Sequence, residues 1–268
     1  FLNALRLLEA RGDRLVRILF IGDSTISGDN VTLQLRNLMT DRFGYGGAGL
    51  VNPGREAHLR QQEARVLSRA SGLLRIPFSV FHLPEFPELG FTGYSYRLSD
   101  TLHVKSRQPP EMIRLIVRGP PGPIQISGRL VIESSQKHSG PCRLFSVDDD
   151  FSNDIIIQTR GNGNSLFLDG LILENRAGLT LSPIVQLGLH QAWMQGIPLE
   201  HLRCGLGLYA PDLIILQSGI NEAETMRAGR RPFDPTVYRE QLLLWLQKLK
   251  KAYQGPVILF GPPERLVV

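Results

Sequence analysis

Short apolar runs alternate with helical patterns at the N-terminal end of the chain. Residues 16–21 form one such run, and its short length and β-branched content predict a buried parallel strand. A helical pattern that ends near Gly12 precedes this strand, and Gly-Asp-Ser at 22–24 follows it directly. Asp29 or Asn30 is expected to cap the next helix, because both residue types favour helix N-termini.

The helix after Gly-Asp-Ser has the spacing of an amphipathic helix. Its apolar residues recur at i, i+4, i+7 and i+8, so we expect them to point towards the core. These residues are Val31, Leu35, Leu38 and Met39. Gly44 follows them, and we expect the helix to end there.

The C-terminal part of the chain repeats this alternation. Residues 212–216 read as a buried strand that runs into Ser-Gly-Ile-Asn at 218–221. Asp234 and Pro235 suit the N-cap and first position of a helix, and residues 257–260 read as another strand. The apolar face of this helix contains Tyr238, Leu242, Trp245, Leu246, Leu249 and Tyr253. Strand–helix–strand order with short links predicts parallel strands, right-handed crossovers and an α/β fold.

The middle of the chain lacks the helical period. Short apolar pieces separated by Gly, Pro, Asn and Asp recur between residues 76 and 182, as is typical of an antiparallel β-sandwich or jelly roll. The pieces include residues 115–117, 124–126, 130–132, 155–157 and 166–168. We therefore expect a discontinuous α/β domain, formed by residues 1–75 and 183–268, with a β-sandwich domain inserted at 76–182.

Composition narrows the range of partners. The 268 residues are 42% hydrophobic, which is enough for a sizeable core, and the formal net charge is +5. A basic protein can bind an anionic partner, but the Lys and Arg residues are scattered and no nucleic-acid signature is present. No apolar run reaches the roughly 18 residues of a membrane span. We expect neither a nucleic-acid partner nor an integral membrane segment.

The sequence predicts no metal and no cofactor. Cys142 and Cys204 belong to no Cys-x-x-Cys or Cys/His cluster, and they can pair only if the fold brings them together. The carboxylates at 148–150 would suit a hard cation such as calcium, but they lack the regular ligand spacing of a known calcium loop. A solvated β-turn is the favoured interpretation of this run.

Two polar residues that follow predicted parallel strands can carry chemistry together. Ser24 stands at the carboxyl end of the first strand, just before a helix, where open α/β sheets bind ligands. Asn221 follows the strand at 212–216, and a side-chain amide there can donate to an oxyanion. A turn serine and a loop asparagine are the alternative interpretation of either residue alone. The two together favour a catalytic site, in which a base must activate the serine.

Five segments resemble the SGNH/GDSL hydrolase family. Residues 20–24, Phe-Ile-Gly-Asp-Ser, resemble its first block, and residues 218–223, Ser-Gly-Ile-Asn-Glu-Ala, resemble its third block. Residues 43–51, 168–175 and 187–192 look like the branch that includes peptidoglycan O-acetylesterases. The resemblance implies a three-layer, flavodoxin-like parallel sheet with an inserted β-domain similar to a carbohydrate-binding module.

The resemblance also implies roles for the site residues. Ser24 would attack an ester carbonyl, and the Asn221 side chain would form the oxyanion hole with backbone N–H groups of Ser24 and of the second block. That block is usually Gly-x-x-Gly. Here Gly188 holds the first position, and Gln191 stands where the second glycine is expected. Gln191 could still supply a backbone N–H, while its side chain would narrow the pocket or strain a position with φ > 0. The supporting residues are Asp23 and Gly219.

The general base of this family lies in an Asp-x-x-His segment after the strand that ends in Gly-Pro-Pro. Here residues 261–263 are Gly-Pro-Pro, and no such segment lies between them and Val268. His190 is the histidine nearest to a functional loop, and a structural or solvent-facing role is expected for it. Loss of the base costs several orders of magnitude in rate, so we expect the base to follow Val268, or the protein to be no enzyme.

The sequence as a whole predicts a carboxylic ester hydrolase that removes O-acetyl groups from a bacterial cell-wall or extracellular glycan. The alternatives are a glycan O-acetyltransferase on the same scaffold and an inactive glycan-binding protein. The predicted partner is an acylated glycan. The family resemblance, and a chain that begins at Phe1 rather than Met, predict a periplasmic or extracellular protein.

Overall fold

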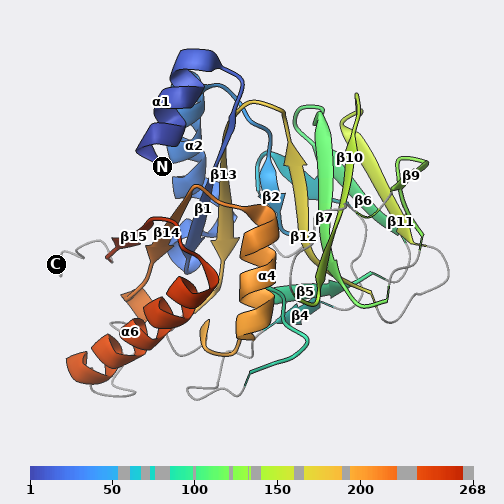
Figure 1. Ribbon diagram of the computed structural model, residues 1–268. Coiled ribbons are helices and arrows are strands. Elements are labelled where there is room, and N and C mark those ends of the chain that lie inside the picture. Colours follow the sequence, from blue (N-terminus) through green and yellow to red (C-terminus); the bar gives the residue numbers. More distant parts are fainter. Residues whose placement is uncertain are drawn as a thin grey trace.

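In a computed structural model of the protein, the described residues form one parallel sheet and two antiparallel sheets (Figure 1). The structure describes residues 1–53, 61–67, 73–75, 85–98, 101–120, 123–131, 133, 140–159, 166–188, 194–221 and 234–261. The parallel and antiparallel sheets confirm the mixed α/β character that the sequence predicted.

Within the described residues, the parallel sheet has four strands in the order β13-β1-β14-β15. These strands are β1 (Leu15–Gly22), β13 (Gly178–Val185), β14 (Leu213–Gln217) and β15 (Val257–Phe260). The helices are α1 (Leu2–Arg11), α2 (Asn30–Phe43), α4 (Leu199–Tyr209) and α6 (Pro235–Ala252), and the 3₁₀ segment η1 (Ser24–Asp29) joins β1 to α2. The structure confirms the three predicted parallel strands, the helix that ends at Gly12 and the helix capped by Asp234.

The side chains of β1 alternate between the two faces of the parallel sheet. Val16, Ile18 and Phe20 belong to the apolar cluster that includes α1 and α2. Leu19 and Ile21 belong to the cluster that includes α4 and α6. The helix residues in these clusters include Ala4, Leu8, Leu35 and Met39 on the first face, and Leu202, Leu206, Trp245 and Leu249 on the second. Because helices cover both faces, β1 is apolar at nearly every position.

Two antiparallel sheets lie beside the parallel sheet (Figure 1). The first has the order β10-β7-β12-β5-β4, with β2 paired to β12, and the second has the order β3-β6-β11-β8-β9. The strands of the first are β2 (Gly49–Val51), β4 (Leu73–Arg75), β5 (Tyr94–Arg97), β7 (Met112–Arg118), β10 (Cys142–Asp148) and β12 (Phe167–Glu174). Those of the second are β3 (Ala64–Val66), β6 (Thr101–Ser106), β8 (Ile124–Ile126), β9 (Arg129–Val131) and β11 (Asp154–Thr159). Each apolar piece predicted in the middle of the chain overlaps one of these strands.

Strand pairing crosses the predicted boundaries at residues 76 and 182, which stay a prediction. Strands β2, β3 and β4 precede residue 76 but pair in the antiparallel sheets, whereas β13 begins at Gly178 and pairs with β1 in the parallel sheet. The polar Ser182 of β13 is buried. The Ser182 hydroxyl accepts the Leu50 N–H at 2.8 Å and lies 2.8 Å from the Tyr209 hydroxyl. That the antiparallel sheets form a separate inserted domain stays a prediction.

The predicted core-facing side of α2 is partly wrong. Val31 and Leu38 are 51% and 71% exposed, whereas Thr32 and Arg36 are buried. The reason is the carboxylate of Asp29, which is buried at the start of the helix and accepts Arg36 Nη1 at 2.8 Å and Arg36 Nη2 at 2.9 Å. A buried carboxylate requires a partner of opposite charge, and this need places a polar stripe on the inner side of α2.

A disulfide connects the first antiparallel sheet to the helical layer of the parallel sheet. Cys142 on β10 is bonded to Cys204 on α4, although 62 residues separate them in the sequence. The sequence had left this pairing open, and the fold supplies the proximity that it required.

Candidate active site

The carboxyl ends of three neighbouring parallel strands bring most of the predicted site residues to one edge of the sheet. Ser24 follows β1, residues 218–221 follow β14, and Gly188 follows β13. The Gln186 N–H donates to the Gly22 carbonyl at 2.9 Å, so the end of β13 is tied to the residue that precedes Asp23. Carboxyl ends of parallel strands are the usual place for a ligand in open α/β folds.

Asp23 is a fully buried carboxylate at this edge. Its Oδ1 accepts the Thr25 N–H at 2.8 Å, which caps η1. Its Oδ2 accepts Gln217 Nε2 at 3.2 Å and Asn221 Nδ2 at 3.4 Å. The Asp23 N–H in turn donates to Gln217 Oε1 at 3.1 Å. Asp23 therefore joins the turn after β1 to the end of β14, and it brings together the first and third blocks of the family resemblance.

Ser24 is the exposed first residue of η1. Gly22, two residues before it, packs closely against the side chains of Gln217 and Ile26. A Cβ atom on Gly22 would lie 2.8 Å from Gln217 Oε1 and 2.9 Å from Ile26 Cδ1. A larger residue at position 22 would therefore force the side chains of Gln217 or Ile26 to shift.

The turn that carries Asn221 also depends on a glycine. Gly219 has φ of 112°, a value that residues with a side chain rarely adopt. The Ser218 N–H donates to the Phe260 carbonyl at 3.3 Å, which ties the start of this turn to β15. The turn returns the chain so that the half-buried Asn221 reaches Asp23.

The described residues include only the first residue of the second block, Gly188. Gly188 has φ of 65°, in the left-handed region that favours glycine. Gln191 and His190 lie outside the described residues, so the predicted Gln191 N–H donor stays a prediction.

A second buried carboxylate, Asp29, fixes the far end of η1. Besides Arg36, it accepts the Gln62 N–H at 3.1 Å and a short hydrogen bond from the Thr32 hydroxyl. Arg36 Nε also donates to the Leu181 carbonyl on β13 at 3.1 Å. The segment that starts at Ser24 is therefore held by a buried carboxylate at each end.

Gln217 is a site residue that the sequence analysis missed. It follows the apolar run 213–216 and directly precedes Ser218, so a polar residue at a strand end was the available signal. Its side-chain amide makes two hydrogen bonds with Asp23: Oε1 accepts the Asp23 N–H, and Nε2 donates to Asp23 Oδ2.

The two described histidines have partners of their own. His201 Nδ1 donates to the Leu89 carbonyl at 2.7 Å, and burial lowers the pKa of His201, which this hydrogen bond opposes. His103 Nε2 lies 3.5 Å from Asp154 Oδ1 on the neighbouring strand of the second antiparallel sheet.

One Asp-x-x-His segment escaped the sequence analysis. Residues 100–103 read Asp-Thr-Leu-His, and Asp100 lies outside the described residues. Its histidine, His103, lies on β6, an antiparallel strand, rather than after the strand that ends in Gly-Pro-Pro. Its place in the chain therefore differs from that of the family's base.

The run 148–150 occupies the end of β10 and the following turn. The Asp150 N–H donates to Asp149 Oδ1 at 2.8 Å, and the Asp149 carboxylate forms an ion pair with Arg129. Among the described residues, no group of three or more His, Cys, Asp and Glu side chains is arranged to hold a metal ion.

Comparisons with known proteins show the fold. The structure is similar to a peptidoglycan O-acetylesterase with a TM-score of 0.76 and 19% sequence identity, over 99% of this chain and 72% of that chain. A family two carbohydrate esterase from Clostridium thermocellum covers 73% of this chain and 79% of its own at 9% identity, but its TM-score of 0.27 carries no argument. No family model and no curated protein matches the chain.

The fold and the residues at the carboxyl ends of the parallel strands indicate the structural class of the chain. The chain has the fold of a peptidoglycan O-acetylesterase, and its resemblance to the SGNH/GDSL hydrolases is confirmed at the level of fold. At this edge stand a serine after β1 and an asparagine after β14, joined through Asp23.

Proposed function

We propose that the protein is a serine esterase that removes O-acetyl groups from a glycan, with Ser24 as its nucleophile. One observation carries the proposal: Asp23 accepts a hydrogen bond from Asn221 while it caps the turn that begins at Ser24. A hydroxyl nucleophile and an amide donor, which acyl transfer needs, thus flank one buried carboxylate. The fold shared with a peptidoglycan O-acetylesterase supports an acetylated glycan as the substrate class.

In the proposed reaction, the Ser24 oxygen attacks the acetyl carbonyl while its proton passes to a general base. The carbonyl oxygen becomes an oxyanion, which the Ser24 N–H and the Asn221 amide stabilise. The bond between the acetyl carbon and the glycan oxygen then breaks, and the glycan hydroxyl leaves with the proton. Water attacks the acetyl-serine in the same manner, which releases acetate and regenerates Ser24.

Asp23 would orient the amide for this task. An amide nitrogen carries two N–H donors, so a bond to Asp23 and donation to an oxyanion are compatible for one Asn221 side chain. Gln217 donates to the same Asp23 oxygen at 3.2 Å and restrains the carboxylate. A donor held in place before the reaction stabilises the developing charge without reorganisation at the moment of attack.

We also propose that the antiparallel sheets form an inserted glycan-binding domain and that the protein works outside the cytoplasm. The Cys142–Cys204 disulfide supports this location, because disulfides persist mainly in oxidising compartments. Separately, no helix among the described residues is long and apolar enough to cross a membrane.

Acetate release from O-acetylated peptidoglycan tests this function. The full-length protein is compared with Ser24→Ala and with Ser152→Ala, which removes an exposed serine of the antiparallel region. We expect Ser152→Ala to match the wild type and Ser24→Ala to lose about 10³-fold or more in kcat. Equal activity of Ser24→Ala and wild type would refute the proposal.

The same assay separates the two alternatives. A transferase would move the acetyl group to an added glycan acceptor faster than to water. An inactive binding protein would retain O-acetylated glycan in a pull-down but release no more acetate than Ser24→Ala.

A further inference from the structure

Residues 85–94, here called the bracing segment, contact the chain on both sides of the second block. On the N-terminal side, Gln186 Nε2 donates to the Thr92 carbonyl at 2.6 Å and the Tyr94 hydroxyl donates to the Val185 carbonyl at 2.7 Å. Gly188 follows only two residues later. These bonds place one end of the second block against the bracing segment.

The C-terminal side of the second block is held in the same way. The Phe86 N–H donates to the Gly196 carbonyl at 2.8 Å, and His201 Nδ1 donates to the Leu89 carbonyl at 2.7 Å. The ring of Phe91 packs so closely on Gly205 of α4 that a Cβ there would lie 2.2 Å from Phe91 Cγ. The bracing segment therefore contacts both flanks of the second block, which are residues 185–188 and 194–197.

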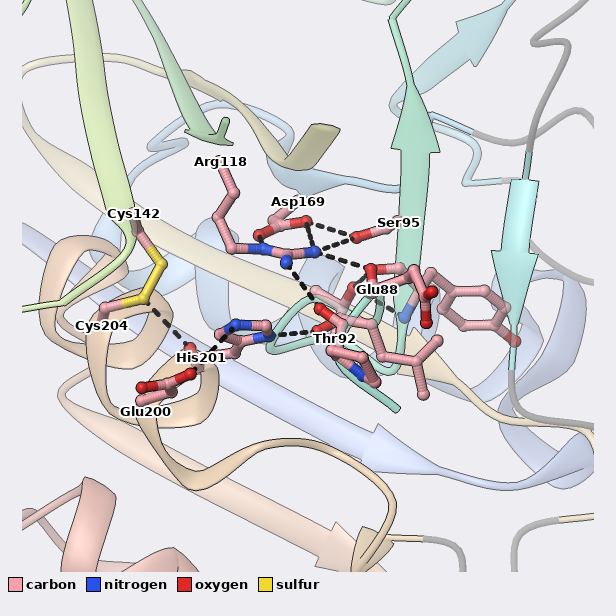
Figure 2. A network of polar contacts seen from close by, with 12 residues as sticks. Glu88, Thr92, Ser95, Arg118, Cys142, Asp169, Glu200, His201 and Cys204 are labelled. Carbon is pink, nitrogen blue, oxygen red and sulfur yellow. Dashed lines mark hydrogen bonds and ion pairs between the residues drawn. A yellow bond between two sulfur atoms is a disulfide. The ribbon is translucent and has the colours of Figure 1, made fainter. Parts of the chain in front are cut away.

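A buried arginine holds the bracing segment itself (Figure 2). Arg118 on β7 donates from Nη1 to the Pro87 carbonyl at 3.0 Å and from Nη2 to the Glu88 carbonyl at 2.6 Å. Its side chain is 7% exposed, and its charge is balanced by Asp169 on β12, which is fully buried. Arg118 Nη2 also donates to Asp169 Oδ1 at 3.1 Å and to the Ser95 hydroxyl at 2.8 Å. The planar guanidinium can satisfy the carboxylate and both carbonyls at once, which a lysine ammonium cannot do with the same geometry.

We propose that Arg118, oriented by Asp169, is a positioning residue for the second block of the esterase site. Arg118 fixes the Pro87 and Glu88 carbonyls, and the bracing segment carries that restraint to the flanks at 185–188 and 194–197, which lie on the two sides of the second block in the sequence. The inference rests on the proposed esterase function. It makes the first antiparallel sheet part of the catalytic apparatus rather than a glycan-binding appendage alone.

The same strand offers a matched control. Arg114 is also on β7, is similarly buried, and pairs with a buried carboxylate of β12, since its Nη2 donates to Glu174 Oε2 at 2.6 Å. It also donates to a backbone carbonyl, that of Leu208 on α4, at 3.4 Å. Within the described part of the chain, the hydrogen bonds of the Arg114 side chain go to Glu174 and Leu208, and none reaches residues 85–94 or the flanks of the second block. Arg114→Lys and Arg118→Lys thus make the same chemical change in similar surroundings.

The test compares kcat and KM for acetate release by the wild type, Arg118→Lys, Arg114→Lys and Ser24→Ala. We expect Arg118→Lys to lower kcat about 10- to 100-fold with little change in KM, because a misplaced donor costs transition-state stabilisation only. Arg114→Lys should keep kcat within about 3-fold of the wild type, whatever the two variants lose in thermal stability.

Hydrogen–deuterium exchange gives a readout that does not depend on activity. Under native conditions, Arg118→Lys should accelerate exchange in peptides that cover residues 185–188 and 194–197, while Arg114→Lys should leave them at the wild-type rate. Equal kcat and equal exchange in the two lysine variants would overturn the inference, with Ser24→Ala inactive and the esterase function intact. Full activity of Ser24→Ala would instead overturn the esterase function, and the exchange data would then still decide whether Arg118 restrains the flanks.

Discussion

Asn221 Nδ2 donates to Asp23 Oδ2 at 3.4 Å, although 198 residues separate the two in the sequence. The bond joins the turns after two neighbouring parallel strands, β1 and β14. Gln217 reinforces it with a hydrogen bond of 3.2 Å to the same oxygen. A single buried carboxylate thus sets how the serine turn and the asparagine turn face each other.

Replacement of Asp23 by asparagine should impair activity more than folding. The new amide can cap η1 through its oxygen, but its NH₂ group would face the Gln217 and Asn221 donors, and two donors cannot bond to each other. We expect kcat to fall about 10- to 100-fold, because small displacements of catalytic groups have effects of that size. Steady-state kinetics and circular dichroism check this, and an unchanged kcat would show that Asp23 does not set the site.

Asn221→Ala should lower kcat with little effect on KM. Removal of one oxyanion donor costs about 10²- to 10³-fold in kcat in measured cases. The matched control is Asn153→Ala, which removes a half-buried asparagine whose Nδ2 donates to the Arg107 carbonyl at 3.3 Å. If both variants keep the wild-type kcat, Asn221 is a structural residue only.

The ion pair behind η1 should contribute strongly to stability. Arg36→Met leaves the carboxylate of Asp29 buried without its cation, and breaking a buried pair in this way costs about 3–5 kcal/mol in the free energy of unfolding. The control is Arg42→Met, which breaks an ion pair to Glu9 with side chains 66% and 50% exposed. Exposed pairs contribute about 1 kcal/mol or less. Urea unfolding curves measure both, and equal midpoints for the two variants would contradict this account.

His201 should make stability depend on pH in one direction. Burial lowers the pKa of His201 from its ordinary 6.5, with the Leu89 hydrogen bond and the charges of Arg118, Asp169 and Glu200 as smaller effects. Below pH 6.5 the unfolded chain therefore binds a proton that the folded protein resists, so the free energy of unfolding decreases as the pH falls through this window. His201→Gln should flatten that decrease, since its amide can donate to Leu89 without titrating. Parallel slopes for the two proteins in urea unfolding at several pH values would refute the role of His201.

The sequence could predict the strands that appear as short runs of apolar residues. The apolar runs at 16–21 and 212–216 became buried parallel strands, because helices on both faces of such a sheet require apolar side chains. The run at 257–260 also became a parallel strand, although residues 258–260 are exposed among the described residues. The polar signals at the strand ends also led to Ser24 and Asn221, since a polar residue after a buried strand reaches the sheet edge.

The features that the sequence did not predict depend on polar groups that are buried and paired with distant residues. Ser182 and Arg36 lie in the core because Tyr209 and Asp29 satisfy them, and the pairing of Arg36 with Asp29 explains why the predicted inner side of α2 was partly wrong. Arg118 looks like any other charged strand residue until its partner Asp169 is known. Single-sequence patterns carry no information on such long-range pairs, which only the fold reveals.

Covalent trapping of the nucleophile tests the central claim most directly. Full-length protein is treated with a serine-reactive fluorophosphonate under native conditions, digested, and mapped by mass spectrometry, with Ser24→Ala treated alongside. We predict one adduct, on the peptide that contains Ser24, and no adduct on Ser24→Ala. Labelling of another residue, or equal labelling of the two proteins, would contradict the assignment of Ser24 as the nucleophile.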